Sequence, residues 1–277
     1  IDVLELSGAT HVLPLIHQLG EHLANRVSAG TSRANVIGKF HHLLLAEFPV
    51  LNTPFQGRAI RDTRLREFTG ATILGVWERG QFLPSRADLE LSPLSVPVVM
   101  GTPEQISELD EVLVIYDPNP NPVLIVGGGK VGRAAAAALK RREIPVHMVE
   151  RDPELEPKIA SIPDRLFLGD AADRCVLDEA GIAETPCILL TTHDDAMNIY
   201  LTVYCRRLNP NARILTRVTH EQNVEAIQRA GADFVLSYAS VGVQTVSSIV
   251  QGRELIVLGE GVDLFYVPLP ESLADKT

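Results

Sequence analysis

Short apolar runs alternate with helix-like segments over the second half of the chain. The apolar runs are residues 123–126, 146–149, 166–168, 187–190, 213–218 and 234–236, and the helix-like segments between them include residues 133–141, 173–180, 195–208 and 221–230. Apolar strands that alternate with helices are typical of βαβ units, in which helices cover both faces of a parallel sheet. The pattern therefore predicts an α/β fold with a Rossmann-like, doubly wound parallel sheet of about six strands.

An apolar helix is predicted near the start of the chain, and a similar segment recurs near its end. One helix face is described by residues that recur every four positions, Leu15, Leu19, Leu23 and Val27. Residues 8–13 (GATHVL) precede this helix, and residues 231–236 (GADFVL) precede a second apolar segment that carries Val243, Val246 and Val250. We interpret this similarity as an internal repeat in a tandem array of lobes, in which the chain starts within one lobe and ends within another. Residues 1–46 are then the tail and crossover helices of an upstream lobe.

A smaller α+β lobe is predicted at residues 47–116. Its expected elements are a helix at 59–68, strands at 72–77 and 96–100, a turn at Arg79-Gly80 and a last helix to about Leu109, which a Thr102/Gln105 capping box begins. The proline- and asparagine-rich residues 117–122 predict a linker. Residues 123–252 then form the Rossmann-like lobe, and residues 253–277 form the incomplete start of a second small lobe.

Composition and charge narrow the classes of function. The 277 residues suffice for about two domains, and the net charge of −10 repels polyanions, which argues against nucleic-acid binding. No apolar run approaches the roughly 20 residues that span a bilayer, so we expect no pore, anchor or signal peptide. Three cysteines without CxxC spacing, in stretches that resemble core, favour a reducing compartment. Because the chain begins at Ile1, we expect a piece of a longer polypeptide, although a removed tag or leader gives the same start.

A glycine-rich turn carries the candidate chemistry. Gly127, Gly129 and Gly132 form a GxGxxG pattern directly after an apolar strand and directly before an alanine-rich segment. In that context the glycines allow a tight turn, close approach of the backbone to a pyrophosphate, and close helix–strand packing. Glu150 ends the next strand, where a carboxylate accepts hydrogen bonds from a ribose diol and repels a 2′-phosphate. The motif predicts a site for NAD(H) or an adenine nucleotide. A ligand-free turn and a solvated acid are the alternatives, and the adjacent Arg151 weakens the exclusion of NADP.

Further polar residues follow the later strands. Asp170 either contacts the adenine or ribose or serves as a turn or cap residue. Thr191 and Thr192 are expected to donate to the ligand, and Arg217 either reaches the phosphates or pairs with a structural acid. No metal-binding motif and no acid–base pair is recognisable, so we expect no metal and assign no catalytic residue.

These residues resemble the RCK family, the regulators of potassium conductance, which are also called KTN or TrkA-type domains. The resemblance rests on IVGGGKVGR at residues 125–133, VERD at 149–152, GDA at 169–171, TTHDD at 191–195 with Asn198, RV at 217–218 and GADFV at 231–235. Residues 53–113 are similar to the small carboxyl-terminal lobe of that family. The resemblance covers nearly the whole chain. Many dehydrogenases share the glycine motif, so the specificity of the resemblance comes from the other segments and the small lobe.

The resemblance implies a non-enzymatic, cytosolic ligand-sensing module of a potassium channel or transporter. In such a module, nucleotide binding changes the geometry of a dimer or ring and so controls the gate, while the membrane pore lies elsewhere in the polypeptide or on another subunit. The helices that follow the two Gly-Ala repeats, around residues 15–27 and 243–250, would exchange between subunits or lobes. The alternative is that the chain's own small lobes cover their apolar faces. The cofactor-binding residues that we expect are Gly127, Gly129, Lys130, Val131, Gly132, Glu150, Arg151, Asp170, Ala171, Thr191, Thr192 and Arg217.

Two features depart from the expected pattern. The upstream lobe lacks a glycine loop, so one complete nucleotide site is expected. Ser237-Tyr238 follows the last strand where the upstream copy has Pro14-Leu15, and this difference has no assigned role. Two other functions stay open, a soluble NAD-dependent oxidoreductase with a late Rossmann domain and a structural dimerisation module.

Overall fold

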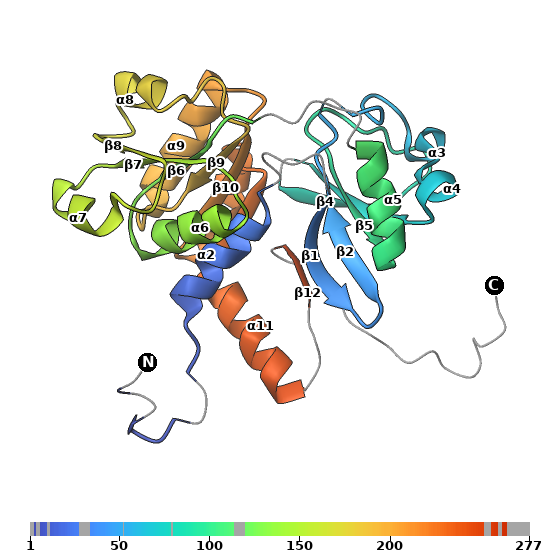
Figure 1. Ribbon diagram of the computed structural model, residues 1–277, viewed down its shortest axis with the longest axis horizontal. Helices are drawn as coiled ribbons and strands as arrows, with labels where there is room; N and C mark the ends of the chain where they lie inside the picture. Colours follow the sequence, from blue (N-terminus) through green and yellow to red (C-terminus); the bar gives the residue numbers. More distant parts are fainter. Residues whose placement is uncertain are drawn as a thin grey trace.

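Two sheets of different construction lie side by side in the computed structural model (Figure 1). The structure describes residues 3, 6–9, 12–27, 34–51, 53–78, 80–113, 120–251, 256–259 and 262–264. Within this part of the chain, the first half forms a five-stranded antiparallel sheet and the second half forms a six-stranded parallel sheet. No helix in the described residues is long and apolar enough to cross a membrane.

The parallel sheet has the strand order β11-β10-β9-β6-β7-β8. Its strands are β6 (Val123–Val126), β7 (Val146–Glu150), β8 (Arg165–Leu168), β9 (Cys187–Leu190), β10 (Arg213–Val218) and β11 (Phe234–Ser237). Neighbouring strands all pair in parallel. The order reverses between β6 and β9, so the sheet is doubly wound with a switch point between these strands. The predicted Rossmann-like fold is confirmed.

Helices cover both faces of the parallel sheet. They are α6 (Lys130–Arg141), α7 (Glu156–Ile159), α8 (Arg174–Glu179), α9 (Asp195–Leu208), α10 (Val224–Arg229) and α11 (Tyr238–Gln251), with short 3₁₀ turns η1 (Pro153–Leu155) and η2 (Glu221–Asn223). On one face, α8 and α9 bury Leu177 and Leu201 against the strands. On the other face, α6 and α7 bury Leu139 and Ile159.

A helix from the start of the chain completes the second face. This helix, α2 (Leu15–Asn25), packs along α6 and over β10 and β11, and its Leu19 and Leu23 are fully buried. At Gly20 the two helices approach so closely that a Cβ would lie 2.6 Å from the Cβ of Ala134. The apolar face that we expected to exchange between subunits is therefore covered within this chain, because the sheet face over β10 and β11 is apolar as well.

The antiparallel sheet has the strand order β1-β2-β5-β3-β4. Its strands are β1 (Asn35–Phe40), β2 (Leu43–Glu47), β3 (Thr72–Glu78), β4 (Gln81–Pro84) and β5 (Val96–Gly101), and its helices are α3 (Ile60–Thr63), α4 (Leu65–Thr69) and α5 (Pro103–Leu113). The helix predicted at residues 59–68 is broken at Arg64, whose φ of +52° is left-handed. The capping box is confirmed, because the Thr102 amide donates to Gln105 Oε1 at 2.9 Å and the Gln105 amide donates to Thr102 Oγ1 at 3.4 Å. The helix extends past Leu109 to Leu113.

One of the expected lobe boundaries falls inside the antiparallel sheet. β1 and most of β2 precede residue 47 and pair into the antiparallel sheet, so this sheet crosses the boundary expected after residue 46. After α11, β12 (Ile256–Gly259) and β13 (Val262–Leu264) form an antiparallel hairpin, as β1 and β2 do after α2. The rest of the segment expected at 253–277, and residues 117–119 of the expected linker, lie outside the described residues.

The three cysteines do not share one environment. Cys187 and Cys205 are buried, as expected, and burial raises the pKa of each thiol to about 12. Cys175 is exposed at the start of α8, so the expectation of a core position is wrong there. The exposed position follows from helix geometry, because Leu177 rather than Cys175 faces the sheet.

A buried carboxylate joins the two sheets. Glu47 of β2 is fully buried, and its carboxylate lies 3.0 Å from Arg26 Nη1 and 3.2 Å from Arg213 Nη1. Arg26 follows α2, and Arg213 begins β10 of the parallel sheet. Arg142, at the end of α6, donates to the carbonyl oxygens of Ala24 and Val27, which extends the joint to a fourth element.

We predict that Glu47→Gln destabilises the protein by about 3–5 kcal/mol, because two buried guanidinium groups lose their counter-charge. Urea unfolding followed by circular dichroism measures this change. Glu21→Gln is the matched control, since Glu21 pairs with Arg141 on the surface and an exposed pair contributes about 1 kcal/mol or less. Equal unfolding free energies for the two variants would contradict the role of Glu47.

Candidate functional site

The glycine loop lies at the switch point, between the end of β6 and the start of α6. Gly127 has a φ of +105°, which side chains rarely allow, and Gly129 is the N-cap of α6. A Cβ on Gly132 would lie 1.9 Å from the carbonyl oxygen of Gly127. A Cβ on Gly129 would have no atom within 4 Å. The first and third glycines are therefore needed by the fold, whereas the second faces open space.

The first turn of α6 can accept an anion. Its free amide groups and the helix dipole give a helix N-terminus positive character, and the first turn has no acidic residue to oppose it. Lys130 is exposed and Val131 is buried at this turn. The local geometry therefore favours a phosphate beside Gly129.

Glu150 fixes the shape of the glycine loop. Its Oε2 accepts a hydrogen bond from the Gly128 amide at 2.5 Å, and its Oε1 accepts one from the Asp152 amide at 2.8 Å. A carboxylate has about four acceptor positions, so two remain for a ribose diol. A Cβ on Gly128 would lie 2.7 Å from Ile159 Cδ1 and 3.2 Å from Glu150 Oε2. Sequence reasoning missed this role of Gly128, and its signal was a glycine at the middle position of three consecutive glycines, where the GxGxxG pattern allows any residue.

Arg151 and Asp170 face each other across the ends of β7 and β8. Arg151 Nη1 lies 3.9 Å from Asp170 Oδ2, and both side chains are exposed. Asp170 Oδ1 also accepts from the Ala172 amide at 2.9 Å, and Ala171 is buried. Asp170 therefore has the geometry of a turn residue, one of its two expected roles, and the pair lies on the Glu150 side of the loop.

The two threonines after β9 hold backbone groups. Thr191 is buried, and its hydroxyl lies 3.0 Å from the carbonyl oxygen of Val126 and 2.8 Å from that of Gly127. The hydroxyl has one hydrogen, so in this structure it donates to the backbone, and the expected contact of Thr191 with a ligand stays a prediction. Thr192 donates to Asn198 Oδ1 at 2.7 Å.

Asp195 holds the loop that follows β10. Its carboxylate accepts hydrogen bonds from the Thr219 and His220 amides and from the Asn223 side chain. Burial alone would raise the pKa of Asp195, but these hydrogen bonds outweigh burial and lower it below its usual value. The hydrogen bonds to Asp195 thus fix the loop that follows Arg217.

Arg217 is buried at the carboxyl end of β10 and donates to Thr219 Oγ1 at 2.6 Å and to the Tyr238 hydroxyl at 3.3 Å. Its partners are neutral groups, so the pairing with a structural acid is not found among the described residues. The predicted strand-end residues thus gather at one edge of the parallel sheet, with Glu150 and Asp170 on one side of the glycine loop and Arg217 on the other.

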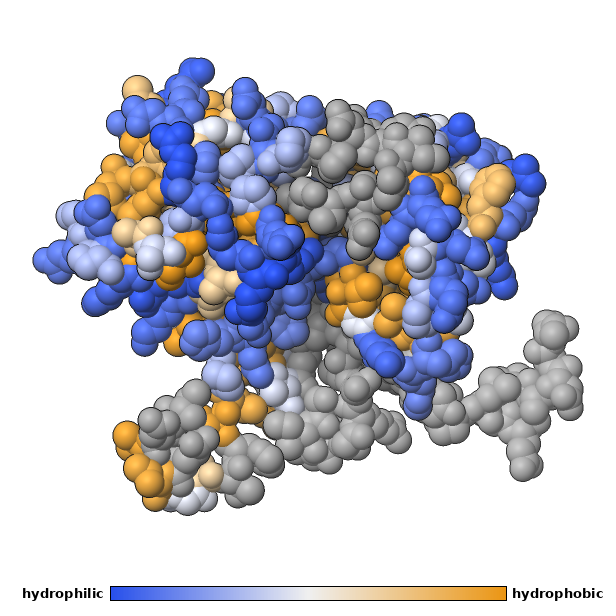
Figure 2. Space-filling view, viewed as in Figure 1, coloured by the Kyte–Doolittle hydropathy of each residue, from blue (hydrophilic) through white to orange (hydrophobic). Residues whose placement is uncertain are grey.

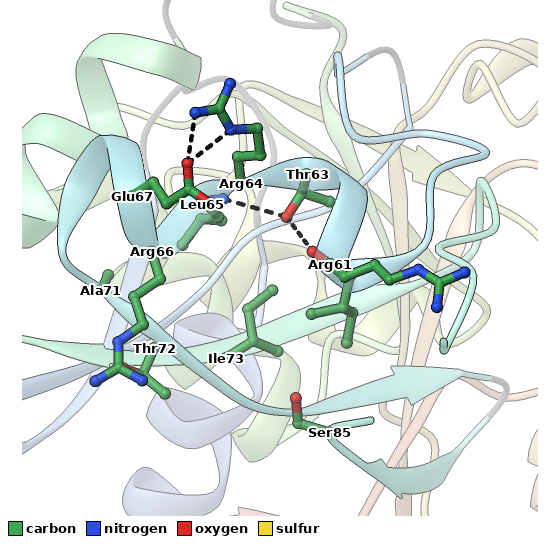
Figure 3. A pocket seen from close by; sticks show the side chains of 11 residues that line it. Arg61, Thr63, Arg64, Leu65, Arg66, Glu67, Ala71, Thr72, Ile73 and Ser85 are labelled. Atoms are coloured by element: carbon green, nitrogen blue, oxygen red, sulfur yellow. Dashed lines mark hydrogen bonds and ion pairs between the residues drawn. The ribbon is translucent and has the colours of Figure 1, made fainter. Parts of the chain in front are cut away.

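A separate pocket lies in the antiparallel lobe (Figure 3). Its volume is about 220 Å³, and α3, α4 and β3 supply most of its lining. Arg64 on its rim pairs with Glu67, and the buried Thr63 hydroxyl donates to the Ile60 carbonyl oxygen. None of the predicted cofactor-binding residues lines this pocket, so it is distinct from the glycine-loop site.

Comparison with known proteins defines the class to which this fold and site belong. The TrkA-C domain family matches residues 45–114, and the TrkA-N domain family matches residues 123–238. The chain therefore carries a TrkA-C domain followed by a TrkA-N domain. It belongs to the RCK family of regulators of potassium conductance, as the resemblance indicated.

Solved structures of GsuK are similar over most of the chain. The crystal structure of the GsuK RCK domain is 36% identical with a TM-score of 0.67, and covers 91% of this chain and 54% of its own. The GsuK channel bound to NAD is 36% identical with a TM-score of 0.65, and covers 100% of this chain and 50% of its own. GsuK bound to ADP is 25% identical with a TM-score of 0.50, and covers 91% of this chain and 42% of its own.

Curated relatives belong to potassium transport systems. Potassium channel protein 1 of Methanocaldococcus jannaschii is 25% identical over 49% of this chain and 41% of its own length. The Trk system potassium uptake protein TrkA of Azorhizobium caulinodans is 25% identical over 73% of this chain and 43% of its own length. The chain thus spans less than half the length of these curated relatives.

We predict that Gly132→Ala destabilises the protein by about 1–3 kcal/mol, because the new methyl group overlaps the Gly127 carbonyl oxygen. Gly129→Ala is the matched variant in the same loop. Its backbone is extended and its surroundings are open, so we expect a change within about 0.5 kcal/mol. Denaturant unfolding measures the free energy of unfolding of both variants. Equal losses of stability would contradict the close contact described here between Gly132 and the Gly127 carbonyl oxygen.

Proposed function

We propose that the chain is a ligand-sensing regulatory module of a potassium channel or transporter, in which NAD(H) or an adenine nucleotide such as ADP, AMP or ATP binds at the glycine loop and controls gating. The observation that carries this proposal is the open Gly129 at the N-terminus of α6, with Glu150 on the neighbouring strand end. The relationship to GsuK, which has been solved with NAD and with ADP, supports it.

Each part of the nucleotide has a proposed contact. The phosphates lie at the first turn of α6, where the amide groups and Lys130 face them, while Gly127 and Gly132 keep the backbone close. The ribose diol donates to the free acceptor positions of Glu150. The adenine lies toward Arg151 and Asp170. Thr191, through the Val126 and Gly127 carbonyl oxygens, and the buried Val131 hold the glycine loop in place. Arg217 at the end of β10 supplies positive charge for the phosphates.

We propose a regulatory rather than a catalytic role, because the curated relatives are components of potassium channels and Trk uptake systems. A membrane pore, on the same polypeptide or on a separate subunit, is then the partner, and the module acts on its cytosolic side. No observation specifically favours the oxidoreductase that shares the glycine motif.

Self-association is part of the proposal, and it uses the second of the two helices that were expected to mediate it. The face of α2 is buried, whereas Val243 and Val246 of α11 are 68% and 49% exposed. Val3 and Leu6 are exposed too, and Figure 2 shows apolar atoms gathered beside the N-terminus. We therefore place the homo-oligomer contact on α11, which sedimentation of a Val246→Asp variant tests: unchanged assembly would exclude this surface.

We predict that Gly129→Val abolishes measurable nucleotide binding and preserves the fold. A Cβ at this position meets no described atom within 4 Å, but the valine side chain occupies the place where the backbone approaches the pyrophosphate. Calorimetry with NAD and ADP measures binding, and thermal unfolding checks the fold. Unchanged affinity in the folded variant would remove the site from the glycine loop.

We also predict that Glu150→Ala weakens NAD and ADP by roughly 1.5–3 kcal/mol, the range for hydrogen bonds to a charged group. NADP binding should not fall in parallel, because its 2′-phosphate is repelled by the carboxylate. Glu154→Ala, an exposed acid on the next turn, is the control. Parallel loss of NAD and NADP affinity would mean that Glu150 acts on the shape of the loop alone.

A further inference from the structure

Arg217 is a buried cation with neutral partners. Only 6% of the residue is exposed, and its Nη atoms donate to Thr219 and Tyr238. Its Nε atom has no hydrogen-bond partner in the part of the chain that the structure describes. Arg26 and Arg213 are buried to a similar degree, and both meet Glu47. A buried charge is costly unless an opposite charge compensates it. Among the described residues, no carboxylate supplies that compensation for Arg217.

The guanidinium group lies on the side of the sheet that α6 covers. Residues two apart in a strand share a face, and Leu215 belongs to the core beneath α6 and α2. One strand, β9, separates β10 from β6, which places the two strand ends about 10 Å apart at the usual spacing. A phosphate-bearing ligand at the glycine loop can bridge this distance to the long side chain of Arg217.

Tyr238 contacts the guanidinium group of Arg217 in this structure, both through its hydroxyl and through its ring. It is the first residue of α11, its hydroxyl accepts from Arg217 Nη1, and its ring centroid lies 4.9 Å from Arg217 Cζ. Ser237 Oγ accepts from the Ser240 amide at 3.0 Å and caps the same helix. The start of α11 is thus tied to the end of β10 through the Arg217–Tyr238 contact.

We propose that Tyr238 competes with the ligand for Arg217: a phosphate of the bound nucleotide takes the guanidinium from Tyr238, and the first turn of α11 is loosened. This inference rests on the nucleotide binding proposed above. The Tyr238 hydroxyl is neutral, whereas a phosphate carries negative charge and can accept two parallel hydrogen bonds from a guanidinium. A phosphate therefore adds a charge–charge attraction that Tyr238 lacks, and the exchange favours the ligand. By linkage, whatever holds Arg217 on Tyr238 lowers nucleotide affinity, and the nucleotide weakens the hold on α11 by the same factor.

The affinities of NAD and ADP for single and double variants test this competition. Calorimetry should show that Tyr238→Phe, which removes the hydroxyl and keeps the ring, binds about two- to tenfold more tightly than the unmodified chain. Arg217→Gln should bind at least tenfold more weakly, and adding Tyr238→Phe to it should change nothing further. Tyr204→Phe is the control, because Tyr204 stacks on Tyr200 of α9 away from Arg217. It should bind like the unmodified chain.

Hydrogen exchange of α11 separates competition from a structural role. Saturating nucleotide should speed exchange of the backbone amides of residues 239–242 in the unmodified chain and leave it unchanged in Arg217→Gln. Equal affinities for the unmodified chain, Tyr238→Phe and Arg217→Gln would overturn the inference while leaving the nucleotide site intact. The inference would also be overturned if saturating nucleotide left the hydrogen-exchange rates of the α11 backbone amides unchanged. If the unmodified chain bound neither NAD nor ADP, the proposed function would fail first.

Discussion

The arrangement of this protein depends on one buried carboxylate. Glu47 meets Arg26 and Arg213, so a strand of the antiparallel sheet, the end of α2 and the start of β10 share a single charged centre. Removing one member of such a group leaves a buried charge without compensation. Arrangements of the two lobes that separate Glu47 from Arg26 and Arg213 are therefore disfavoured. Arg213 is at the amino end of its strand. The antiparallel lobe is therefore held at the amino edge. Among the described residues, it leaves the carboxyl edge, where doubly wound sheets bind ligands, uncovered.

Helix α6 links this joint to the candidate site. Its N-cap, Gly129, faces the place proposed for phosphate, and Arg142 at its other end donates to Ala24 and Val27 beside the joint. The close approach at Gly20 holds α2 along the length of α6. α2 in turn contacts α11, where Thr245 Oγ1 lies 3.4 Å from Gln18 Oε1 and 2.8 Å from the Val241 carbonyl oxygen. Packed helices thus connect the candidate site, the lobe joint and α11. In the proposed function, nucleotide binding would act through this connection to change the angle between the lobes.

The candidate site was predictable where a residue type has a single physical use in its context. A strand, three spaced glycines and a helix predicted the loop, and the acid at the next strand end predicted the position of Glu150, because parallel strands end at one edge. Thr191, Asp170 and Arg217 were placed at that edge, but their hydrogen-bond partners were not foreseen. A hydroxyl or guanidinium can face a ligand or the backbone equally well, and the choice is made by residues distant in sequence, such as Tyr238 for Arg217.

The sequence by itself determined the six-stranded doubly wound sheet, the capping box of α5 and the glycine loop, because each follows from local periodicity or from the conformational limits of glycine. Only the tertiary structure decided that α2 covers β10 and β11, that β1 and β2 belong to the antiparallel sheet, and that Glu47 joins the lobes. These features are pairings between residues far apart in the chain. An apolar helix face such as that of Leu19 and Leu23 specifies that it must be buried, and it does not specify against which surface.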